Sequence, residues 1–129
     1  MNGAPSLRVF IVENHEDTLK WLAIYLESVG HLVQSARSMT SALEALSTAV
    51  IDVLISDIGL PDGDGWELLR RAGLPPRVYA IAMSGFGTQS DRLKSRDAGY
   101  RQHILKPFVP DDLDAMLEEA QREQAPAGA

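Results

Sequence analysis

Short apolar runs alternate along the chain with longer stretches in which apolar side chains recur every three or four positions. The runs are typical of β-strands, and the periodic stretches are typical of amphipathic helices. The pattern predicts strands at residues 9–12, 31–36, 51–56, 77–83 and 102–105. It predicts helices at residues 18–29, 39–46, 64–72, 88–98 and 110–122. Ser38 is suited to cap the second helix, and Gly30 and Gly99 are suited to end the first and the fourth.

The alternation of strands and helices predicts a doubly wound α/β fold, in which helices cover both faces of a parallel sheet. The runs at residues 9–12, 51–56 and 77–83 are almost continuously apolar, as expected when both faces of a sheet are buried. Right-handed crossovers then leave only a few topologies. The 129 residues suit one domain, and neither an internal repeat nor a long linker divides them.

Polar side chains follow four of the predicted strands at the point where each strand ends. These side chains, in chain order, are Glu13, Asn14, Asp57, Ser84 and Lys106. Parallel strands that share a direction end at one edge of a sheet, and open α/β sheets bind ligands outside that edge. We therefore expect these side chains to converge, although they are far apart in the sequence.

The expected cluster combines oxygen ligands that suit Mg²⁺ with a lysine that suits a phosphate. Ser84 opens the small-residue segment SGFGT, whose backbone N–H groups can approach an anion. These groups predict a phosphoryl site in which Asp57 is the candidate nucleophile. The chain has no GxxxxGKS or GxxxxGKT segment, which disfavours a P-loop enzyme. The anionic segment ENHED is unsuited to the phosphate loop of a flavodoxin.

The formal net charge of −6 argues against a nucleic-acid-binding protein and against docking on an anionic membrane. The chain has no cysteine, which excludes disulfides, thiolate zinc sites and cysteine nucleophiles. No apolar run approaches the ~18 residues that span a bilayer, and no signal-peptide pattern opens the chain. We therefore expect a cytoplasmic protein that binds neither nucleic acid nor membrane.

Four segments together resemble the response-regulator receiver domains of two-component signalling. They are VEN after the first strand, SDIGLPDGDGWELL around Asp57, AMSGFG after the fourth strand and AGYRQHILKPF around Lys106. The resemblance covers residues 7–122 and implies a receiver domain there. The small and polar residues at 1–6 and 123–129 predict flexible ends with no output domain, so we expect a stand-alone receiver or one excised from a larger protein. The resemblance also implies a five-stranded parallel sheet in the order 2-1-3-4-5 with five helices on two faces, a flavodoxin-like three-layer sandwich.

The resemblance implies a mechanism for the predicted site. Asp57 accepts a phosphoryl group from a histidine kinase or a phosphotransfer protein, and Lys106 contacts Asp57 before the transfer and the phosphate after it. Mg²⁺ assists the transfer, and its expected ligands are Glu13, Asn14, Asp57 and the backbone carbonyl of Gly59. Positioning and charge neutralisation then carry most of the catalysis.

Ser84 and His103 lie where the family has its two switch residues, a hydroxyl that moves toward the phosphoryl group and an aromatic ring. A half-exposed strand residue with no signalling role is the alternative for His103. The expected result of phosphorylation is a changed surface for a downstream protein, on a monomer or weak dimer. The resemblance also implies a cis peptide between Lys106 and Pro107. An enzyme such as an aspartyl-phosphate hydrolase is disfavoured, since no second catalytic acid follows Asp57 at short range.

Asn14 departs from the family, which usually has a carboxylate at this position. An amide oxygen can coordinate Mg²⁺ but brings no charge, so we expect metal binding to be weaker by about an order of magnitude or more. Two hypotheses stay open. The chain is either a phospho-acceptor with a weakened metal site or a phosphorylation-independent docking module. Asn14 could also cap the following helix.

Other polar and aromatic side chains near the expected site have simpler interpretations. His15 is expected to be solvated rather than a ligand, and Asp62 and Asp64 are expected to be loop and helix-cap residues. On the first helix, Trp21 and Tyr25 fall largely outside the core stripe of Leu19, Leu22, Ala23 and Leu26. A partner-binding surface and partial burial are the two hypotheses for them.

Overall fold

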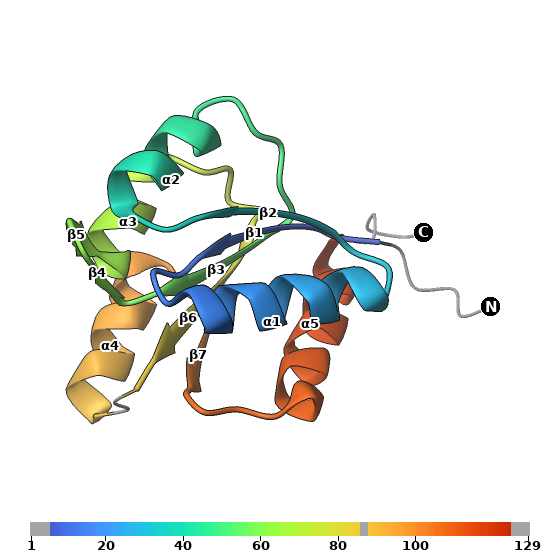
Figure 1. Ribbon diagram of the computed structural model, residues 1–129. Helices are drawn as coiled ribbons and strands as arrows, with labels where there is room; N and C mark the ends of the chain where they lie inside the picture. The colour runs from blue at the N-terminus through green and yellow to red at the C-terminus, as the bar shows by residue number, and fades with distance from the viewer. Residues whose placement is uncertain (1–5, 86–87, 125–129) are drawn as a thin grey trace.

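The computed structural model describes residues 6–85 and 88–124 (Figure 1). Its five long strands are β1 (Arg8–Val12), β2 (Leu32–Ala36), β3 (Val53–Asp57), β6 (Tyr79–Ser84) and β7 (Gln102–Leu105). Its helices are α1 (Glu16–Ser28), α2 (Met39–Leu46), α3 (Gly65–Ala72), α4 (Gln89–Ala98) and α5 (Pro110–Gln124). The short strands β4 (Gly59–Leu60) and β5 (Gly63–Asp64) form an antiparallel hairpin that the pattern did not predict. Most of the predicted flexible ends and residues 86–87 of the SGFGT segment lie outside the described residues.

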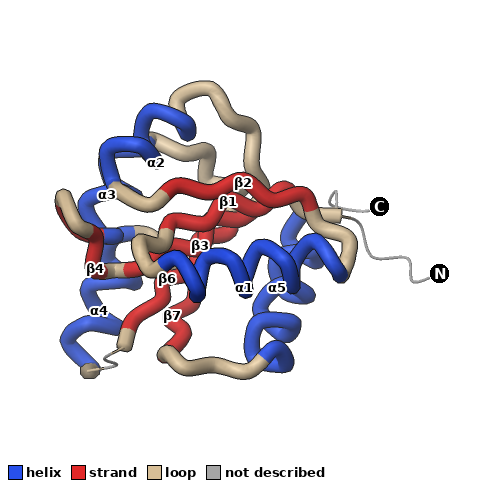
Figure 2. Tube along the Cα trace, in the orientation of Figure 1, coloured by secondary structure: helices blue, strands red, loops and turns tan. Residues whose placement is uncertain are grey.

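The five long strands form one parallel sheet in the order β2-β1-β3-β6-β7. This order confirms the predicted 2-1-3-4-5, because the hairpin β4-β5 only shifts the numbers of the last two strands. Helices α1 and α5 cover one face of the sheet, and α2, α3 and α4 cover the other (Figures 1 and 2). The predicted three-layer sandwich is therefore confirmed.

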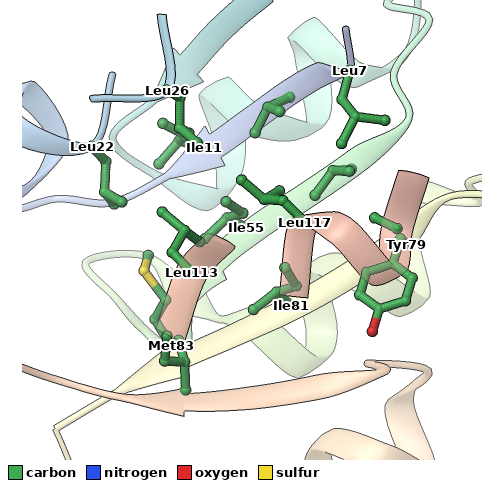
Figure 3. Packing of buried hydrophobic residues seen from close by; sticks show 14 residues of the cluster. Leu7, Ile11, Leu22, Leu26, Ile55, Tyr79, Ile81, Met83, Leu113 and Leu117 are labelled. Atoms are coloured by element: carbon green, nitrogen blue, oxygen red, sulfur yellow. The ribbon is translucent and has the colours of Figure 1, made fainter. Parts of the chain in front are cut away.

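Successive residues of β1 point into two separate cores. Val9 and Ile11 pack with α1 and α5, whereas Phe10 and Val12 pack with α2 and α3. Each of these four side chains is 1% exposed or less. Side chains alternate between the faces of a strand, so a strand covered on both faces has to be apolar throughout. Figure 3 shows the first core, where leucines of α1 and α5 meet β1, β3 and β6.

A side chain caps the beginning of each of the first four helices by accepting a hydrogen bond from a backbone N–H of the first turn. These caps are His15, Ser38, Asp64 and Thr88. The cap predicted at Ser38 is confirmed, as is the role of Asp64. His15 starts α1 at Glu16, two residues before the predicted start, so the alternative role of Asn14 as the helix cap is wrong.

The last helix extends to Gln124, two residues beyond the predicted end. The Gln124 side-chain amide donates to the backbone carbonyl oxygens of Arg77, at 2.8 Å, and Asp52, at 3.5 Å. These contacts hold the helix end against the sheet. Flexibility of residues 123–129 stays a prediction. Within the described part of the chain, no helix combines the length and the apolar character needed to cross a bilayer.

A buried aspartate joins the beginnings of three strands, at the end of the sheet opposite the predicted site. Asp52 accepts hydrogen bonds from the backbone and guanidinium of Arg8 at 2.8 to 3.0 Å, and from Arg77 at 3.1 Å. The hydrogen bond from the Arg8 side chain holds the pKa of Asp52 below its usual value. These ion pairs align the starts of β1, β3 and β6.

The start of α3 approaches the end of β3 so closely that only glycine fits there. Gly65 donates its backbone N–H to the carbonyl oxygen of Ile58 at 2.8 Å. A Cβ on Gly65 would lie 2.6 Å from the backbone carbonyl oxygen of Asp57. A Cβ on Gly59, in the adjacent hairpin, would meet no atom within 4 Å.

Gly65→Ala is expected to lower the free energy of unfolding by about 1–3 kcal/mol, because the new methyl group must displace α3 or the Asp57 backbone. Urea unfolding followed by far-ultraviolet circular dichroism measures this loss. Gly59→Ala is the matched control and is expected to stay within about 0.5 kcal/mol of the unmodified protein. Equal stability of the two variants would contradict the close contact.

Candidate functional site

The carboxyl ends of β1, β3, β6 and β7 meet at one edge of the sheet, as predicted. Glu13 directly follows β1, Asp57 ends β3, Ser84 ends β6 and Lys106 directly follows β7. The Lys106 ammonium Nζ donates to Glu13 Oε1 at 2.7 Å and to Asp57 Oδ2 at 3.0 Å. The predicted convergence of these three side chains is therefore observed.

Burial and mutual contact set the charges of this trio. Burial and the neighbouring Glu13 carboxylate raise the pKa of Asp57 to about 6. Burial alone would raise the pKa of Glu13, but hydrogen bonds from Lys106 and the His15 backbone N–H outweigh it and lower that pKa. Burial alone would lower the pKa of Lys106, but the two carboxylates outweigh it and raise that pKa. At neutral pH the trio therefore holds one cation between two acidic groups.

The donor set at this edge fits a hard divalent cation. Glu13 is only 1% exposed, and its contact with Asp57 leaves two carboxylates to share a single ammonium. Carboxylates with one or two further oxygens are the protein ligands that Mg²⁺ uses. Across residues 6–85 and 88–124, no group of three or more His, Cys, Asp or Glu side chains is arranged to hold a metal. A metal here would therefore need neutral oxygens from neighbouring residues.

The structure places the two predicted neutral ligands at the same edge. Asn14 lies exposed in the loop after Glu13, and its backbone carbonyl accepts a hydrogen bond from Arg37 at 3.1 Å. Gly59 is exposed two residues after Asp57. Coordination by the Asn14 amide and by the Gly59 carbonyl stays a prediction.

Ser84 and His103 contact each other directly. Ser84 Oγ lies 2.7 Å from His103 Nε2, and the other ring nitrogen, Nδ1, lies 3.0 Å from Ser95 Oγ. His103 is therefore a half-buried, hydrogen-bonded strand residue, and its role as a switch stays a prediction. Ser95 in turn accepts a hydrogen bond from the Trp66 indole at 2.9 Å. Sequence reasoning missed Ser95 and Trp66, and no pattern singles them out because the contact joins three elements.

The acidic side chains of the β4-β5 hairpin do not join the site. Asp62 accepts hydrogen bonds from the backbone N–H groups of Met39 and Thr40 and from the Thr40 hydroxyl, at 2.6 to 2.8 Å. Asp64 caps α3 through the backbone N–H of Glu67. The predicted loop and cap roles are both confirmed.

A cleft of about 440 Å³ lies beside Lys106. Its walls come from α1 and the segment after β7, and include Trp21, Lys106 and Phe108. The Trp21 ring stacks on Tyr25 at 5.9 Å, meets Phe108 edge-on at 5.8 Å and remains 40% exposed. Partial burial is thus confirmed for this tryptophan, and a partner-binding role stays a prediction. The Lys106–Pro107 peptide is cis, as the resemblance implied.

Comparison with known proteins identifies close sequence relatives. A family model described as the response regulator receiver domain matches residues 9–118. The KDP operon transcriptional regulatory protein KdpE of Escherichia coli K12 is 35% identical over 88% of this chain and 51% of its own length. The C4-dicarboxylate transport regulatory protein DctD of Rhizobium meliloti 1021 is 35% identical over 88% of this chain and 24% of its own length. The chain thus spans about half of the length of the first relative and about a quarter of the length of the second.

Solved structures share the fold over almost the whole chain. A CheY-like receiver domain protein from Methanospirillum hungatei JF-1 aligns with a TM-score of 0.87 at 30% identity, covering 93% of this chain and 97% of the other. The receiver domain of a sensor histidine kinase from Pseudomonas aeruginosa PAO1 aligns with a TM-score of 0.81 at 23% identity. That alignment covers 92% of this chain and 99% of the other, whose active-site cleft holds a coordinated magnesium ion.

Asp57→Asn is expected to make the fold more stable at neutral pH in buffer with EDTA. The folded protein holds the Asp57 proton up to about pH 6, whereas the unfolded chain releases it near its ordinary pKa of 3.8. Stability is therefore lost as the pH rises through this window, by about 1–3 kcal/mol in total. The measurement is the difference in unfolding free energy between variant and unmodified protein, expected to be large at about pH 7.5 and near zero at about pH 4.

Asp62→Asn is the control with the opposite sign. Hydrogen bonds from the hydroxyl and backbone of Thr40 and from the backbone of Met39 lower the pKa of Asp62 to about 2. Its ionised form stabilises the fold at neutral pH, and this contribution is lost as the pH falls toward that value. The Asp62 variant is therefore expected to be less stable at neutral pH. If Asp57→Asn were also less stable at neutral pH, the claim that the ionised Asp57 carboxylate destabilises the fold would be refuted.

Proposed function

Because the chain belongs to the response-regulator receiver family of two-component signalling systems, we propose that Asp57 accepts a phosphoryl group from a phosphohistidine of a histidine kinase or phosphotransfer protein. The observation that carries the proposal is the contact of one ammonium, Lys106 Nζ, with both Asp57 and Glu13. This contact positions a nucleophilic oxygen, a cation for the incoming phosphate and an acidic partner at one sheet edge.

In the proposed transfer, a carboxylate oxygen of Asp57 forms a bond to phosphorus as the bond between phosphorus and the donor nitrogen breaks. The bonding electrons stay on the nitrogen of the donor imidazole, and the product is an acyl phosphate. Asp57 has to be ionised to react, and its pKa of about 6 leaves it mostly ionised at neutral pH. Lys106 then stabilises the negative charge on the phosphoryl oxygens.

Glu13, Asp57 and Asn14, with the backbone carbonyl of Gly59, are the groups that would hold Mg²⁺. Bound Mg²⁺ would supply positive charge to the phosphoryl oxygens during the transfer. Support comes from the two carboxylates that share one ammonium, and from the same fold in the Pseudomonas neighbour, whose cleft holds magnesium. Replacement of a carboxylate by the Asn14 amide weakens this binding.

Phosphorylation is proposed to change a surface that a downstream protein recognises, with Ser84 and His103 between the acceptor and that surface. Their contact at 2.7 Å supports this role, because a shift of the Ser84 hydroxyl toward Asp57 would alter the environment of His103. The domain acts in the cytoplasm, as a monomer or weak dimer, through binding rather than through turnover of a separate substrate. These statements rest on the family and on the site.

Incubation with acetyl phosphate across a Mg²⁺ series is expected to produce an acyl phosphate on Asp57. Intact-protein mass spectrometry measures the adduct, and hydroxylamine should remove it. Asp57→Asn should form none, whereas Asp62→Asn should form the adduct normally because Asp62 binds only α2. No adduct at any Mg²⁺ level, combined with failure of a histidine kinase donor, would leave phosphorylation-independent docking as the function.

Asn14→Asp is expected to tighten Mg²⁺ binding by about tenfold or more, because it restores a third negative charge next to Glu13 and Asp57. Isothermal titration calorimetry of the unphosphorylated protein measures the dissociation constant. Gln34→Glu on β2 adds the same net charge away from the Glu13–Lys106–Asp57 trio and is expected to change Mg²⁺ affinity much less. Equal effects of the two variants would show that Asn14 does not contact the metal.

A further inference from the structure

A line of four hydrogen-bonded side chains, each on a different element of the fold, leads away from the sheet edge that holds Asp57. It begins at Ser84 at the end of β6 and passes through His103 on β7 and Ser95 on α4 to Trp66 on α3. The successive distances are 2.7 Å, 3.0 Å and 2.9 Å. Ser84 and Ser95 are 9% and 1% exposed, whereas His103 and Trp66 are half-buried.

The indole of Trp66 determines which group donates and which accepts in each hydrogen bond of this line. An indole N–H can only donate, so Ser95 Oγ accepts at that end. In the described part of the chain, the hydrogen-bond partners of the Ser95 hydroxyl are Trp66 and His103. The Ser95 hydrogen is therefore directed to His103, because a buried hydroxyl hydrogen without an acceptor is costly.

The direction determines the tautomer of His103. Since His103 Nδ1 accepts from Ser95, the neutral ring carries its hydrogen on Nε2. That hydrogen donates to Ser84 Oγ at 2.7 Å. With its oxygen accepting from His103, the Ser84 hydroxyl directs its own hydrogen away from the His103 ring.

We propose that Trp66 is a positioning residue: through Ser95 and His103 it orients the Ser84 hydroxyl to donate its hydrogen to the phosphoryl group on Asp57. The last step rests on the proposed function, whereas the tautomer of His103 does not. The backbone supports the arrangement, because Ser84 accepts a hydrogen bond from the Lys106 N–H at 2.8 Å and its neighbour Met83 pairs with Asp57. Ser84 therefore belongs to the same rigid sheet edge as the acceptor.

The indole is itself held in place by a second contact. Lys94 Nζ on α4 lies 5.2 Å from the centre of the Trp66 ring, a cation–π geometry. Phenylalanine at this position keeps a ring for Lys94 and removes only the N–H. Trp66→Phe is therefore the variant that separates the donor from the packing.

The first experiment records ¹⁵N–¹H correlation spectra of the histidine rings in the full, unphosphorylated chain at about pH 8. His103 is expected to show the Nε2–H tautomer, and Trp66→Phe is expected to lose that preference. His31 is the internal control, since its Nδ1 accepts from the Leu7 backbone N–H at 3.0 Å and its signals should not change. An Nδ1–H tautomer in the unmodified protein, or an unchanged His103 in Trp66→Phe, would overturn the proposal.

The second experiment measures the rate of acyl phosphate formation from acetyl phosphate. Trp66→Phe and Ser95→Ala are each expected to slow it about two- to tenfold, the size of one lost hydrogen bond. The double variant should be no slower than the single ones, because both break the same line. Ser28→Ala, whose hydroxyl bonds only within α1, is the matched serine control. Additive losses would refute a single line.

A rescue variant distinguishes the orientation of the Ser84 hydroxyl from a loss of packing around Trp66. His103→Gln carries an amide N–H near the Nε2 position whatever its other neighbour donates, so it should restore the rate in the Trp66→Phe background. If His103→Gln does not restore the rate although the His103 tautomer is as expected, Trp66 sets only the tautomer of the His103 ring. Its proposed role in phosphorylation would then be refuted. If the unmodified protein forms no adduct at all, the proposed function fails, and the spectra alone decide whether Trp66 sets the tautomer.

Discussion

The Lys106 ammonium, held between the carboxylates of Glu13 and Asp57, is the interaction on which the candidate site depends. It joins the ends of β1, β3 and β7, which are neighbours or near neighbours in the sheet but far apart in the chain. One cation serves a buried and a partly buried carboxylate, and burial together with the neighbouring Glu13 carboxylate raises the pKa of Asp57. Two carboxylates that share one ammonium make the edge receptive to further positive charge, which is what a phosphoryl transfer site needs.

The sheet tolerates the unfavourable proximity of Glu13 and Asp57 because its other regions are well packed and their charges are paired. Two cores bury every residue of β1 from Val9 to Val12, and the Asp52 ion pairs align the strand starts at the opposite end. Gly65 lets α3 begin against the carbonyl of Asp57, and the Tyr100 hydroxyl donates to the Gly65 carbonyl at 2.6 Å. Asp57 is therefore attached to a backbone that has little freedom to relax away from Glu13.

Hydrophobic periodicity predicts the strands and helices, because these follow from burial. The strand order comes from the family resemblance, and the polar edge follows from the common direction of parallel strands. The boundaries depended on single side chains, such as His15 as a helix cap and Gln124 reaching back to the sheet, which periodicity does not encode. The β4-β5 hairpin is too short to produce an alternating pattern. Ser95 and Trp66 were not predictable, since their contact depends on how α3 and α4 pack on each other.

The absence of a charge on the Asn14 side chain has two electrostatic consequences. A carboxylate there would attract a metal ion more strongly, but it would also add a third negative group beside Glu13 and Asp57, with Lys106 as the ammonium between the last two. A phosphoryl group brings further negative charge to the same edge, and repulsion between charges a few ångströms apart is strong where water is partly excluded. In the proposed function, the amide would therefore lower both the attraction for the metal and the repulsion of the phosphate. The balance of these two effects, rather than metal affinity alone, would then determine how readily Asp57 accepts a phosphoryl group.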